Sequence, residues 1–415
     1  MTSFYDALET RAPAEREAAH LAALPTQVAH ARTHSSAFAA ILAGVDPALV
    51  TSRAALARLP VTRKHELLER QQAERSHDVF GGFATVGFGA AMPRVFASPG
   101  PIYEPEGTRR DYWRMARAMH AAGFQAGELI HNCFSYHFVP AGSMMESGAH
   151  ALGCTVFPGG TGQTEQQVQA MADLRPAGYI GTPSFLKLIV EKAQEMHVPL
   201  PSVTKALLSA EAFPPSLRDW FAERGITGYQ CYGTADLGLI AYETAAREGL
   251  VMDEGVIVEI VRPGTGDPVP EGEVGELVIT TLNTDYPLIR FGTGDLSAIL
   301  PGTCPTGRTN TRIKGWMGRA DQTTKVRGLF VHPGQVASIT SRFPQVLRAR
   351  LIVRGEMAND QMVLQVETTE TAGGLAPRLQ DAIREVTKLR GEVELVAPGT
   401  LPNDGKVIED ARSYR

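Results

Sequence analysis

Short apolar runs alternate with amphipathic segments through the middle of the chain. The runs have the length and composition of strands buried on both faces of a sheet, and the segments between them have helical spacing. Strands are predicted at 129–134, 155–158, 178–182, 205–210 and 228–233, and helices between them at segments such as 164–174 and 183–196. Because strand and helix alternate in succession, the pattern predicts a parallel sheet covered on both faces.

The pattern changes towards both ends of the chain. Residues 3–75 are Ala-rich with Arg and Glu at helical spacing, which predicts helices with breaks at Pro25 and Pro60. After residue 250, apolar runs at 256–263 and 275–282 flank a turn-rich segment and predict a β-hairpin. The last hundred or so residues are predicted as strands at 348–355, 361–368 and 392–398 with helices at 334–343 and 375–391.

These elements predict an α/β protein of two domains. The large N-terminal domain has mixed and parallel sheets layered with helices plus a β-rich layer, and the small C-terminal domain is α+β. The predicted ranges are 1–318 for the large domain, divided into a helical cap (1–80), an α/β core (81–250) and a β-rich subdomain (251–318), and 319–415 for the small domain. Since ligands bind beyond the carboxyl ends of parallel strands, the loops from Phe134, Ala210 and Tyr232 are expected to face one crevice.

Composition narrows the class of partner. The chain has 415 residues, 43% hydrophobic and 20% charged, with a formal net charge of -5, so it offers no general attraction to nucleic acid or anionic membrane. A small-molecule substrate is the expected partner. The N-terminus lacks the apolar core of a signal peptide and no run of eighteen apolar residues occurs, which predicts a cytoplasmic protein. The four cysteines are scattered without a CxxC pair, so neither a disulfide framework nor a compact zinc site is indicated.

Five segments follow one another along the second half of the chain. They are "LLSAEAFPP" (207–215), "CYGTADLG" (231–238), "IRFGTGDLS" (289–297), "KGWMGRADQTTKVRGLFVHPGQV" (314–336) and "LPNDGKVIED" (401–410). In this order they resemble the motifs of the adenylate-forming superfamily, most closely the phenylacetate-CoA ligase family, and the resemblance runs from residue 5 to the Lys406 loop. It implies that a carboxylic acid attacks ATP to give an acyl-adenylate, which CoA then converts to a thioester. It also implies Mg²⁺, a small domain that moves between the two steps, and a homodimer.

The resemblance assigns nucleotide contacts to the first three segments. Asp295 matches the carboxylate that holds the ribose, although a turn-capping Asp next to glycine would look the same. Ser209, Ala210 and Glu211 match the loop that covers the adenine, although a plain strand-to-helix connection is the alternative. Within "YGTAD", Tyr232 and Gly233 match the pair that stacks on adenine and turns beneath the phosphates, Thr234 belongs to the same nucleotide-binding segment, and Asp236 stands where the family usually has a magnesium-binding Glu. Ala235 replaces a Ser or Thr that touches phosphate.

The resemblance assigns the last two segments to catalysis and domain movement. Arg319 matches a nucleotide-contacting Arg, Asp321 the hinge and Gly328 a glycine that lets the pantetheine arm of CoA pass. Lys406 matches the mobile lysine that reaches the reacting carboxylate and the α-phosphate. The alternatives are a surface Arg-Asp pair and a solvated lysine.

The family's phosphate loop is altered in this chain. "SPGPIYEP" (98–105) aligns with Ser-Ser-Gly-Thr-Thr-Gly-Lys-Pro, so Ser98 and Gly100 are kept but Glu104 replaces the lysine. At about 4 Å, two unit charges interact by roughly 4 kcal/mol at an effective dielectric near 20, so replacing attraction by repulsion matters. Glu104 acts through magnesium, or Arg109 or Arg110 holds the triphosphate, or the loop serves another ligand.

The residues that follow the first predicted strand of the core are candidates for binding the acid. Tyr136, His137, Phe138 and Ala141 lie where the family binds the acid and could frame a flat aryl group, although they could equally pack the crevice floor. Some relatives bind a structural zinc, but of the matching positions only Cys304 is a potential ligand, so no zinc is expected.

The primary interpretation is an AMP-forming acid-CoA ligase for a small, aromatic acid. The alternative is a protein that binds an adenylate or acyl-CoA, or a transferase that uses one, without ATP-dependent ligation.

Overall fold

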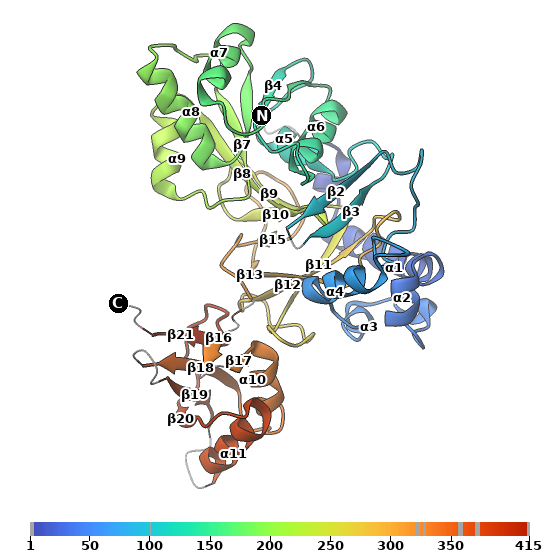
Figure 1. The fold of residues 1–415 in the computed structure, drawn as a ribbon, viewed down its shortest axis with the longest axis vertical. Helices are drawn as coiled ribbons and strands as arrows, with labels where there is room; N and C mark the ends of the chain where they lie inside the picture. Colours follow the sequence, from blue (N-terminus) through green and yellow to red (C-terminus); the bar gives the residue numbers. More distant parts are fainter. Residues whose placement is uncertain are drawn as a thin grey trace. The chain divides into compact units, whose positions relative to one another are not determined.

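The computed structural model describes residues 4–99, 101–320, 322, 324–326, 329–355, 360–369 and 374–412 (Figure 1). The chain divides into two compact units. Unit 1 comprises residues 1–258, 279–291 and 300–315, and unit 2 comprises residues 259–278, 292–299 and 316–415. The domain boundary at residues 318 and 319 stays a prediction.

Helices form the N-terminal part of unit 1, as the Ala-rich pattern predicts. They are η1 (Ala7–Thr10), α1 (Pro13–His34), α2 (Ser36–Ile41), η2 (Pro47–Leu49), α3 (Arg53–Leu56) and α4 (Lys64–Glu74). The predicted break at Pro25 is wrong, because α1 continues through this residue. A proline inside a helix costs about 3 kcal/mol. The fully buried Leu24, Val28 and Ala31 on the same helix offset this cost by packing.

A nine-stranded sheet is the centre of unit 1. Its strands are β4 (Leu129–Asn132), β5 (Thr155–Phe157), β6 (Gly178–Gly181), β7 (Lys205–Leu208), β8 (Thr227–Thr234), β9 (Gly238–Glu243), β10 (Leu250–Met252), β14 (Ile299–Leu300) and β15 (Arg312–Ile313), in the order β14-β15-β10-β9-β8-β7-β6-β4-β5. The five predicted strands are present, and they pair in parallel from β5 to β8. Their carboxyl ends therefore share one edge, where the loops after β4, β7 and β8 begin.

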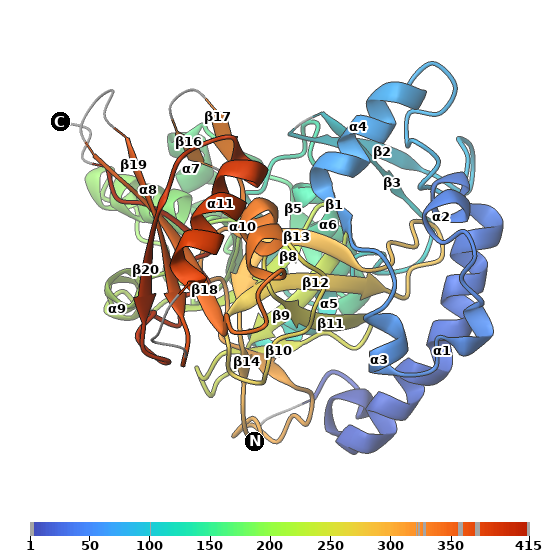
Figure 2. The ribbon, with the colours of Figure 1, turned by 90° about the horizontal axis from the view of Figure 1, so that it is seen from below.

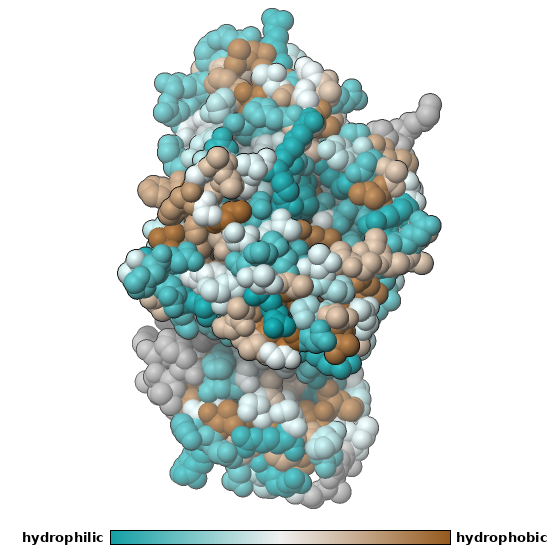
Figure 3. Space-filling view, turned by 90° about the vertical axis from the view of Figure 1, so that its right-hand side faces the viewer, coloured by the Kyte–Doolittle hydropathy of each residue, from teal (hydrophilic) through white to brown (hydrophobic). Residues whose placement is uncertain are grey.

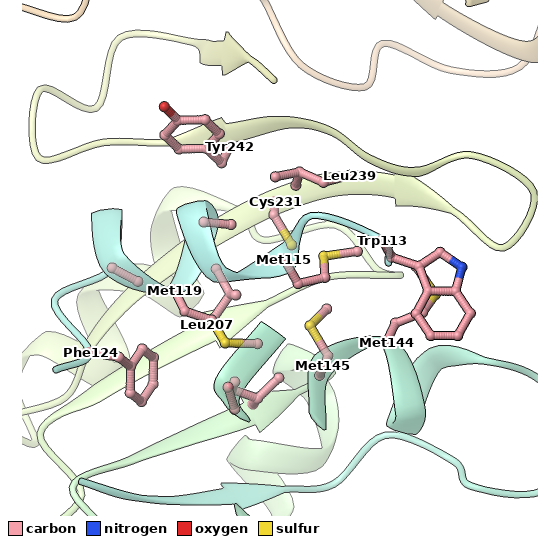
Figure 4. Close-up of a cluster of buried hydrophobic side chains, with 14 of the residues drawn as sticks. Trp113, Met115, Met119, Phe124, Met144, Met145, Leu207, Cys231, Leu239 and Tyr242 are labelled. Carbon is pink, nitrogen blue, oxygen red and sulfur yellow. The ribbon is translucent and has the colours of Figure 1, made fainter. Parts of the chain in front are cut away.

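Helices cover both faces of this sheet. The covering helices are α5 (Met115–Ala121), α6 (Ala141–Leu152), α7 (Thr164–Leu174), α8 (Pro183–Glu195) and α9 (Pro215–Ala222). Met119 of α5 and Met145 of α6 pack with Leu207 and Leu239 of the sheet in one core cluster (Figure 4). A second cluster joins Ile189 of α8 to the sheet's other side chains. The parallel strands are thus buried on both faces, which explains why they are apolar throughout.

The segment aligned with the phosphate loop is a β-hairpin in unit 1. Strands β2 (Arg94–Ser98) and β3 (Ile102–Glu106) pair antiparallel, with Phe96 opposite Glu104. Only residues 99–101 lie between the two strands. Glu104 is consequently in a strand, with a side chain that is buried.

A four-stranded sheet has the order β1-β13-β12-β11. Its strands are β1 (Thr62–Arg63), β11 (Val256–Val261), β12 (Gly275–Thr281) and β13 (Phe291–Ser297). The predicted hairpin strands at 256–263 and 275–282 are therefore present as neighbours in a sheet.

The C-terminal part of unit 2 is an α+β fold, as predicted. It consists of β16 (Thr324–Val326), β17 (Leu329–Val331), α10 (Pro333–Thr340), β18 (Arg348–Arg354), β19 (Gln361–Glu367), α11 (Leu375–Thr387), β20 (Glu392–Val396) and β21 (Ile408–Asp410). The larger sheet has the order β20-β19-β18-β21, and α10 and α11 lie along it (Figure 2). Ile339 and Ile383 of the two helices pack on Leu364 of the sheet.

The surface carries no continuous apolar area on the face shown in Figure 3, where apolar side chains are scattered among polar ones. In the part of the chain that the structure describes, no helix is both long enough and apolar enough to cross a membrane.

Gly148 tests the close packing of α5 against α6. A Cβ atom at this position would lie 2.6 Å from Met115 Cβ and 2.8 Å from the Ala116 nitrogen. We expect Gly148→Ala to lower the free energy of unfolding by about 1 to 3 kcal/mol through overpacking, as measured by urea denaturation. Gly87→Ala is the matched control, because a Cβ at that position would have no heavy atom within 4 Å. Equal stability of the two variants would contradict the packing.

Candidate functional site

The adenine-loop residues lie at the carboxyl edge of the parallel sheet in unit 1. Ser209, directly after β7, donates a hydrogen bond from Oγ to the Cys231 carbonyl oxygen at 2.8 Å. Ala210 follows with a φ of +67°, a left-handed conformation that is uncommon outside glycine. Glu211 accepts a hydrogen bond from the Ser184 nitrogen at 3.2 Å, at the start of α8. The loop is thus tied to β8 and α8 and turns sharply where the sequence places the adenine.

Tyr232, Gly233 and Thr234 form the end of β8. The pairing of β8 with β9 is irregular between Tyr232 and Gly233, as in the bulges that often lie beside active sites. A Cβ on Gly233 would lie 2.6 Å from the Gly238 carbonyl oxygen, so only glycine fits this approach of the two strands. Thr234 Oγ1 accepts a hydrogen bond from the Leu237 nitrogen at 3.2 Å. These contacts fix the turn that leads to Asp236.

Asp236 and Glu104 form a buried carboxyl pair. Glu104 Oε1 accepts a hydrogen bond from the Ser98 hydroxyl at 2.5 Å, and Asp236 Oδ2 lies 2.9 Å from Lys64 Nζ. The remaining oxygens, Glu104 Oε2 and Asp236 Oδ1, are buried without a hydrogen-bond partner in the described structure when both groups are ionised. One proton shared between these two oxygens satisfies both of them.

The environment of Glu104 keeps this proton at neutral pH. Burial raises the pKa of Glu104 to about 9, and the negative charge of Asp236 acts in the same direction. Lys64 and the Ser98 hydroxyl act in the opposite direction but do not outweigh the burial. Burial thus favours the neutral form of Glu104 at pH 7, and the repulsion of a triphosphate expected from the sequence stays a prediction. Burial, followed by the charges of Asp236 and Glu104, also raises the pKa of the nearby Tyr286 hydroxyl.

Lys64 is the cation of this cluster, and sequence reasoning missed it. Its side chain, at the first residue of α4, is 37% exposed while that of Asp236 is 1% exposed. The ammonium can therefore meet a ligand from solvent while it neutralises Asp236. No motif marks this lysine, since 172 positions separate it from Asp236.

Arg109 and Arg110 are the other cations that the sequence offered for phosphate. Arg109 donates a hydrogen bond to the Asn283 side chain and lies 3.8 Å from an oxygen of Asp285. Arg110 donates a hydrogen bond to the Ala151 carbonyl oxygen at 2.7 Å. Both side chains are thus engaged by groups of unit 1 other than the carboxyl pair.

The carboxyl pair is also the place to ask whether this chain could bind Mg²⁺. Mg²⁺ binds hard oxygen ligands and keeps several waters, so one or two carboxylate oxygens suffice. Asp236 supplies such a carboxylate, whereas the raised pKa of Glu104 favours its neutral form, which is a poor ligand for Mg²⁺. Within the described ranges, no group of three or more His, Cys, Asp or Glu side chains could hold a metal ion. The residues present therefore fit a magnesium ion held partly by water or phosphate, and do not form an all-protein cage.

Asp295 and Arg319 are brought together in unit 2. Asp295 Oδ1 accepts hydrogen bonds from Arg319 Nη1 at 2.8 Å and from Trp316 Nε1 at 3.1 Å. Asp295 is 8% exposed. Gly294 before it has a φ of +72°, and a Cβ at this position would lie 2.7 Å from Arg319 Nη2. Trp316 was not among the expected site residues, although it lies three positions before Arg319 in the same motif. The carboxylate is thus held in one orientation by two donors.

Lys406 is exposed on a loop of unit 2 between β20 and β21. It lines a pocket of about 280 Å³ with residues that include Arg262, Arg348 and Val274. Three other expected site residues, Gly100, Asp321 and Gly328, lie outside the described residues.

The expected acid-binding residues lie where β4 leads into α6. The Tyr136 hydroxyl accepts a hydrogen bond from Asn132 Nδ2 and donates one to Glu146 Oε2, both at 2.8 Å. Ala141 is the first residue of α6, and a Cβ on the next residue, Gly142, would lie 2.8 Å from the Tyr136 ring. His137 and Phe138 are exposed, Phe138 to 82%. The structure therefore packs Tyr136 against the first turn of α6 at Gly142 and leaves His137 and Phe138 at the surface.

The chain is similar to proteins that act on carboxylic acids and CoA. A family model described as "AMP-binding enzyme" matches residues 108–284. The chain is 33% identical over 344 residues to the phenylacetate-coenzyme A ligase of Thermus thermophilus, covering 79% of this chain and 75% of that protein. It is 30% identical over 380 residues to the enzyme of the same name from Aromatoleum evansii, covering 86% and 84%. A crystal structure of 2-hydroxyisobutyryl-CoA ligase with 2-HIB-AMP and CoA superposes with a TM-score of 0.71 at 26% identity, covering 95% of this chain and 90% of that one.

The carboxyl pair predicts a pH dependence of stability. Because the pKa of Glu104 rises from 4.5 to about 9 on folding, its proton stabilises the folded state fully below about pH 4.5, and this contribution is lost as the pH rises towards 9. Glu104→Gln keeps a donor for Asp236 but cannot ionise. We expect its denaturant midpoint to fall less than that of the unmodified protein between about pH 5 and 9.

The control is Glu191→Gln, which removes an exposed carboxylate that pairs with Lys187 on α8. This variant should keep the pH dependence of the unmodified protein. Identical pH profiles for Glu104→Gln and the unmodified protein would show that Glu104 carries no retained proton.

Proposed function

The chain belongs to the phenylacetate-coenzyme A ligase family, and we propose that it activates a small aromatic carboxylic acid. It is an acid-CoA ligase that forms AMP. In the first step a carboxylate oxygen attacks the α-phosphorus of ATP, and the bond to pyrophosphate breaks. In the second step the thiolate sulfur of CoA attacks the acyl carbon, and the bond to AMP breaks. ATP, AMP and CoA are its nucleotide ligands.

The burial of Glu104 on a hydrogen bond from Ser98, beside the Lys64–Asp236 ion pair, is the observation that favours ligation over mere binding. A charged Glu104 would repel a triphosphate by roughly 4 kcal/mol per pair of charges at about 4 Å. The pKa of about 9 for Glu104 removes this charge at neutral pH, and Lys64 provides a cation beside Asp236. This supports a subsite that still accepts polyphosphate, with the positive charge supplied by α4 in place of the loop.

The nucleotide contacts follow from the motif positions. We assign Asp295 to the ribose hydroxyls and Arg319 to the nucleotide, since their ion pair places a carboxylate, which can accept several hydrogen bonds, beside a cation. Ser209, Ala210, Glu211 and Tyr232 are assigned to adenine, and Gly233 and Thr234 to the turn beneath the phosphates. We assign the hinge to Asp321 and the pantetheine passage to Gly328 on the motif alone.

The phosphate subsite is assigned to Ser98, Gly100, Glu104, Lys64 and Asp236. When Mg²⁺ is bound it would lower the charge repulsion at the phosphates, and Asp236 is the residue proposed to hold it. Lys406 is proposed to contact the carboxylate and the α-phosphate, where an ammonium stabilises the negative charge that develops as the phosphoryl group is transferred. These residues together provide cations for a substrate that carries several negative charges.

The acid is proposed to lie against Tyr136 and Ala141. The Tyr136 hydroxyl is occupied by Asn132 and Glu146, which holds the ring in place as an aryl-stacking surface. His137 and Phe138 would contribute only where a bound acid reaches the exposed part of their loop. Homodimerisation, which the resemblance implies, and a cytoplasmic location also stay predictions.

ATP-pyrophosphate exchange tests the proposed function. With Mg²⁺ and a panel of aryl and arylacetic acids that includes phenylacetate, we expect acid-dependent exchange and, with CoA, thioester formation. Asp236→Ala should lower exchange by about a hundredfold, because it removes the proposed ion ligand and the partner of Lys64. Asp173→Ala, on the exposed surface of α7, is the control and should keep full exchange. AMP binding without exchange for any acid would favour the alternative of a binding protein.

Asp295 tests the ribose assignment separately. A hydrogen bond to a charged group contributes about 1.5 to 3 kcal/mol, so Asp295→Asn should weaken AMP binding by about ten- to a hundredfold in calorimetry. Asp381→Asn changes an exposed carboxylate on α11 of the same unit and should leave the dissociation constant unchanged. If Asp295→Asn binds AMP as the unmodified protein does, Asp295 does not hold the ribose.

A further inference from the structure

The side-chain amide of Gln322 forms hydrogen bonds with the backbone on both sides of Lys406 in unit 2. Gln322 Nε2 donates a hydrogen bond to the Gly405 carbonyl oxygen at 3.0 Å. Gln322 Oε1 accepts hydrogen bonds from the Val407 nitrogen at 2.5 Å and the Ile408 nitrogen at 2.8 Å. These three bonds go to the residues on either side of Lys406, so a single side chain fixes the backbone from which the lysine extends.

The chemistry of this contact requires a side chain with both a donor and an acceptor. A glutamine presents an NH₂ group and a carbonyl oxygen at the end of a flexible stem, and both are used here. An ionised glutamate could accept from the two nitrogens but could not donate to the Gly405 carbonyl oxygen. A methionine has similar length and volume but can make none of these bonds at normal strength.

Other contacts hold the same loop and leave the lysine side chain exposed. Asp404 Oδ1 accepts a hydrogen bond from the Lys406 nitrogen at 3.0 Å, and Asn403 Oδ1 accepts one from the Val274 nitrogen at 3.2 Å. Gly405 has a φ of +70°, and a Cβ there would lie 2.5 Å from Val274 Cγ1. The backbone at Lys406 is therefore fixed while its ammonium group remains available.

Gln322 also has a particular place in the chain. It directly follows Asp321, the residue assigned as the hinge. A rotation about residue 321 would separate the Lys406 loop from Val274, which precedes residue 321. Gln322 and the Lys406 loop would still move together, because the three hydrogen bonds join them. The direction in which Lys406 extends is thereby linked to the segment that follows the hinge.

We propose that Gln322 is a positioning residue that holds Lys406 in place for formation of the acyl-adenylate. The inference rests on the proposed function, in which Lys406 serves the first half-reaction. Both polar groups of the Gln322 side chain are bonded to the backbone on either side of Lys406, so its proposed effect acts through that backbone. A misplacement of a catalytic group by about 1 Å can cost a hundredfold in rate.

The test separates the two half-reactions for the acid of the panel that the unmodified protein activates fastest. The first is followed by ATP-pyrophosphate exchange, and the second by the release of AMP from the preformed acyl-adenylate with CoA. We expect Gln322→Met to lower the exchange rate by about ten- to a hundredfold and to change the second half-reaction by less than about twofold. Gln365→Met is the matched control. The side chain of this glutamine in β19 donates a hydrogen bond to the Glu394 side chain instead of the Lys406 loop, so the variant should leave both rates unchanged.

A double variant shows whether Gln322 acts through Lys406. Lys406→Ala should abolish most exchange, and adding Gln322→Met to it should cause no further loss, because the side chain that Gln322 positions is gone. Equal losses in both half-reactions, or additive losses in the double variant, would overturn the inference and indicate a general structural role. Normal exchange by Lys406→Ala would instead refute the role of Lys406 in the proposed function.

If Gln322→Met does not fold, Gln322→Glu provides the same comparison, because the carboxylate keeps both acceptor contacts with the Val407 and Ile408 nitrogens. A loss confined to exchange supports the inference, and unchanged exchange overturns it.

Discussion

Two carboxyl groups that are buried together can be accommodated only if one keeps its proton or if cations neutralise both. Glu104 and Asp236 meet this constraint in both ways, since Glu104 holds a proton at neutral pH and Asp236 pairs with Lys64. The pair joins three separate elements of unit 1: the β2-β3 hairpin, the turn after β8 and the start of α4. The charge at this place in unit 1 depends on that proton, and so does the affinity of the proposed phosphate subsite for an anion.

The constraint also explains how the hairpin can replace a flexible phosphate loop. Residues 102–106 pair along their length with β2, so the Glu104 side chain is directed by the alternation of a strand and not by loop mobility. A lysine at this buried position would place a second ammonium beside Lys64. A protonated glutamate adds no charge and accepts a hydrogen bond from the Ser98 hydroxyl. The positive charge then comes from a helix N-terminal residue, whose side chain is partly exposed and can respond to the ligand.

Much of the fold follows from the sequence because its signals are local. The five parallel strands were predicted from apolar runs, and the order β5-β4-β6-β7-β8 places their loops at one edge. The ion pair between Asp295 and Arg319 was not predicted, and their assigned nucleotide contacts stay predictions. The carboxyl pair could not be predicted, since the burial of Glu104 and its contact with Asp236 depend on tertiary packing. Lys64 and Gln322 were missed for the same reason, because their partners are distant in the sequence. Gln322 lies within the 314–336 segment, but the resemblance assigns no role to its position.

Two residues of unit 2, Asp295 and Lys406, differ in how firmly their side chains are held. The ribose contact that we propose for Asp295 requires its carboxylate to be held in one orientation, and hydrogen bonds from Trp316 and Arg319 to Asp295 on β13 hold it. The role that we propose for Lys406 requires it to reach a group whose charge changes during the reaction, and its exposed side chain is compatible with that role. A free lysine side chain loses up to about 2 kcal/mol of conformational entropy when it is ordered. Fixing the backbone beneath it, through Gln322, Asp404 and the left-handed Gly405, removes the additional cost of ordering the main chain when the substrate binds. In the proposed function, this loop would therefore contribute to catalysis by fixing the backbone from which Lys406 extends.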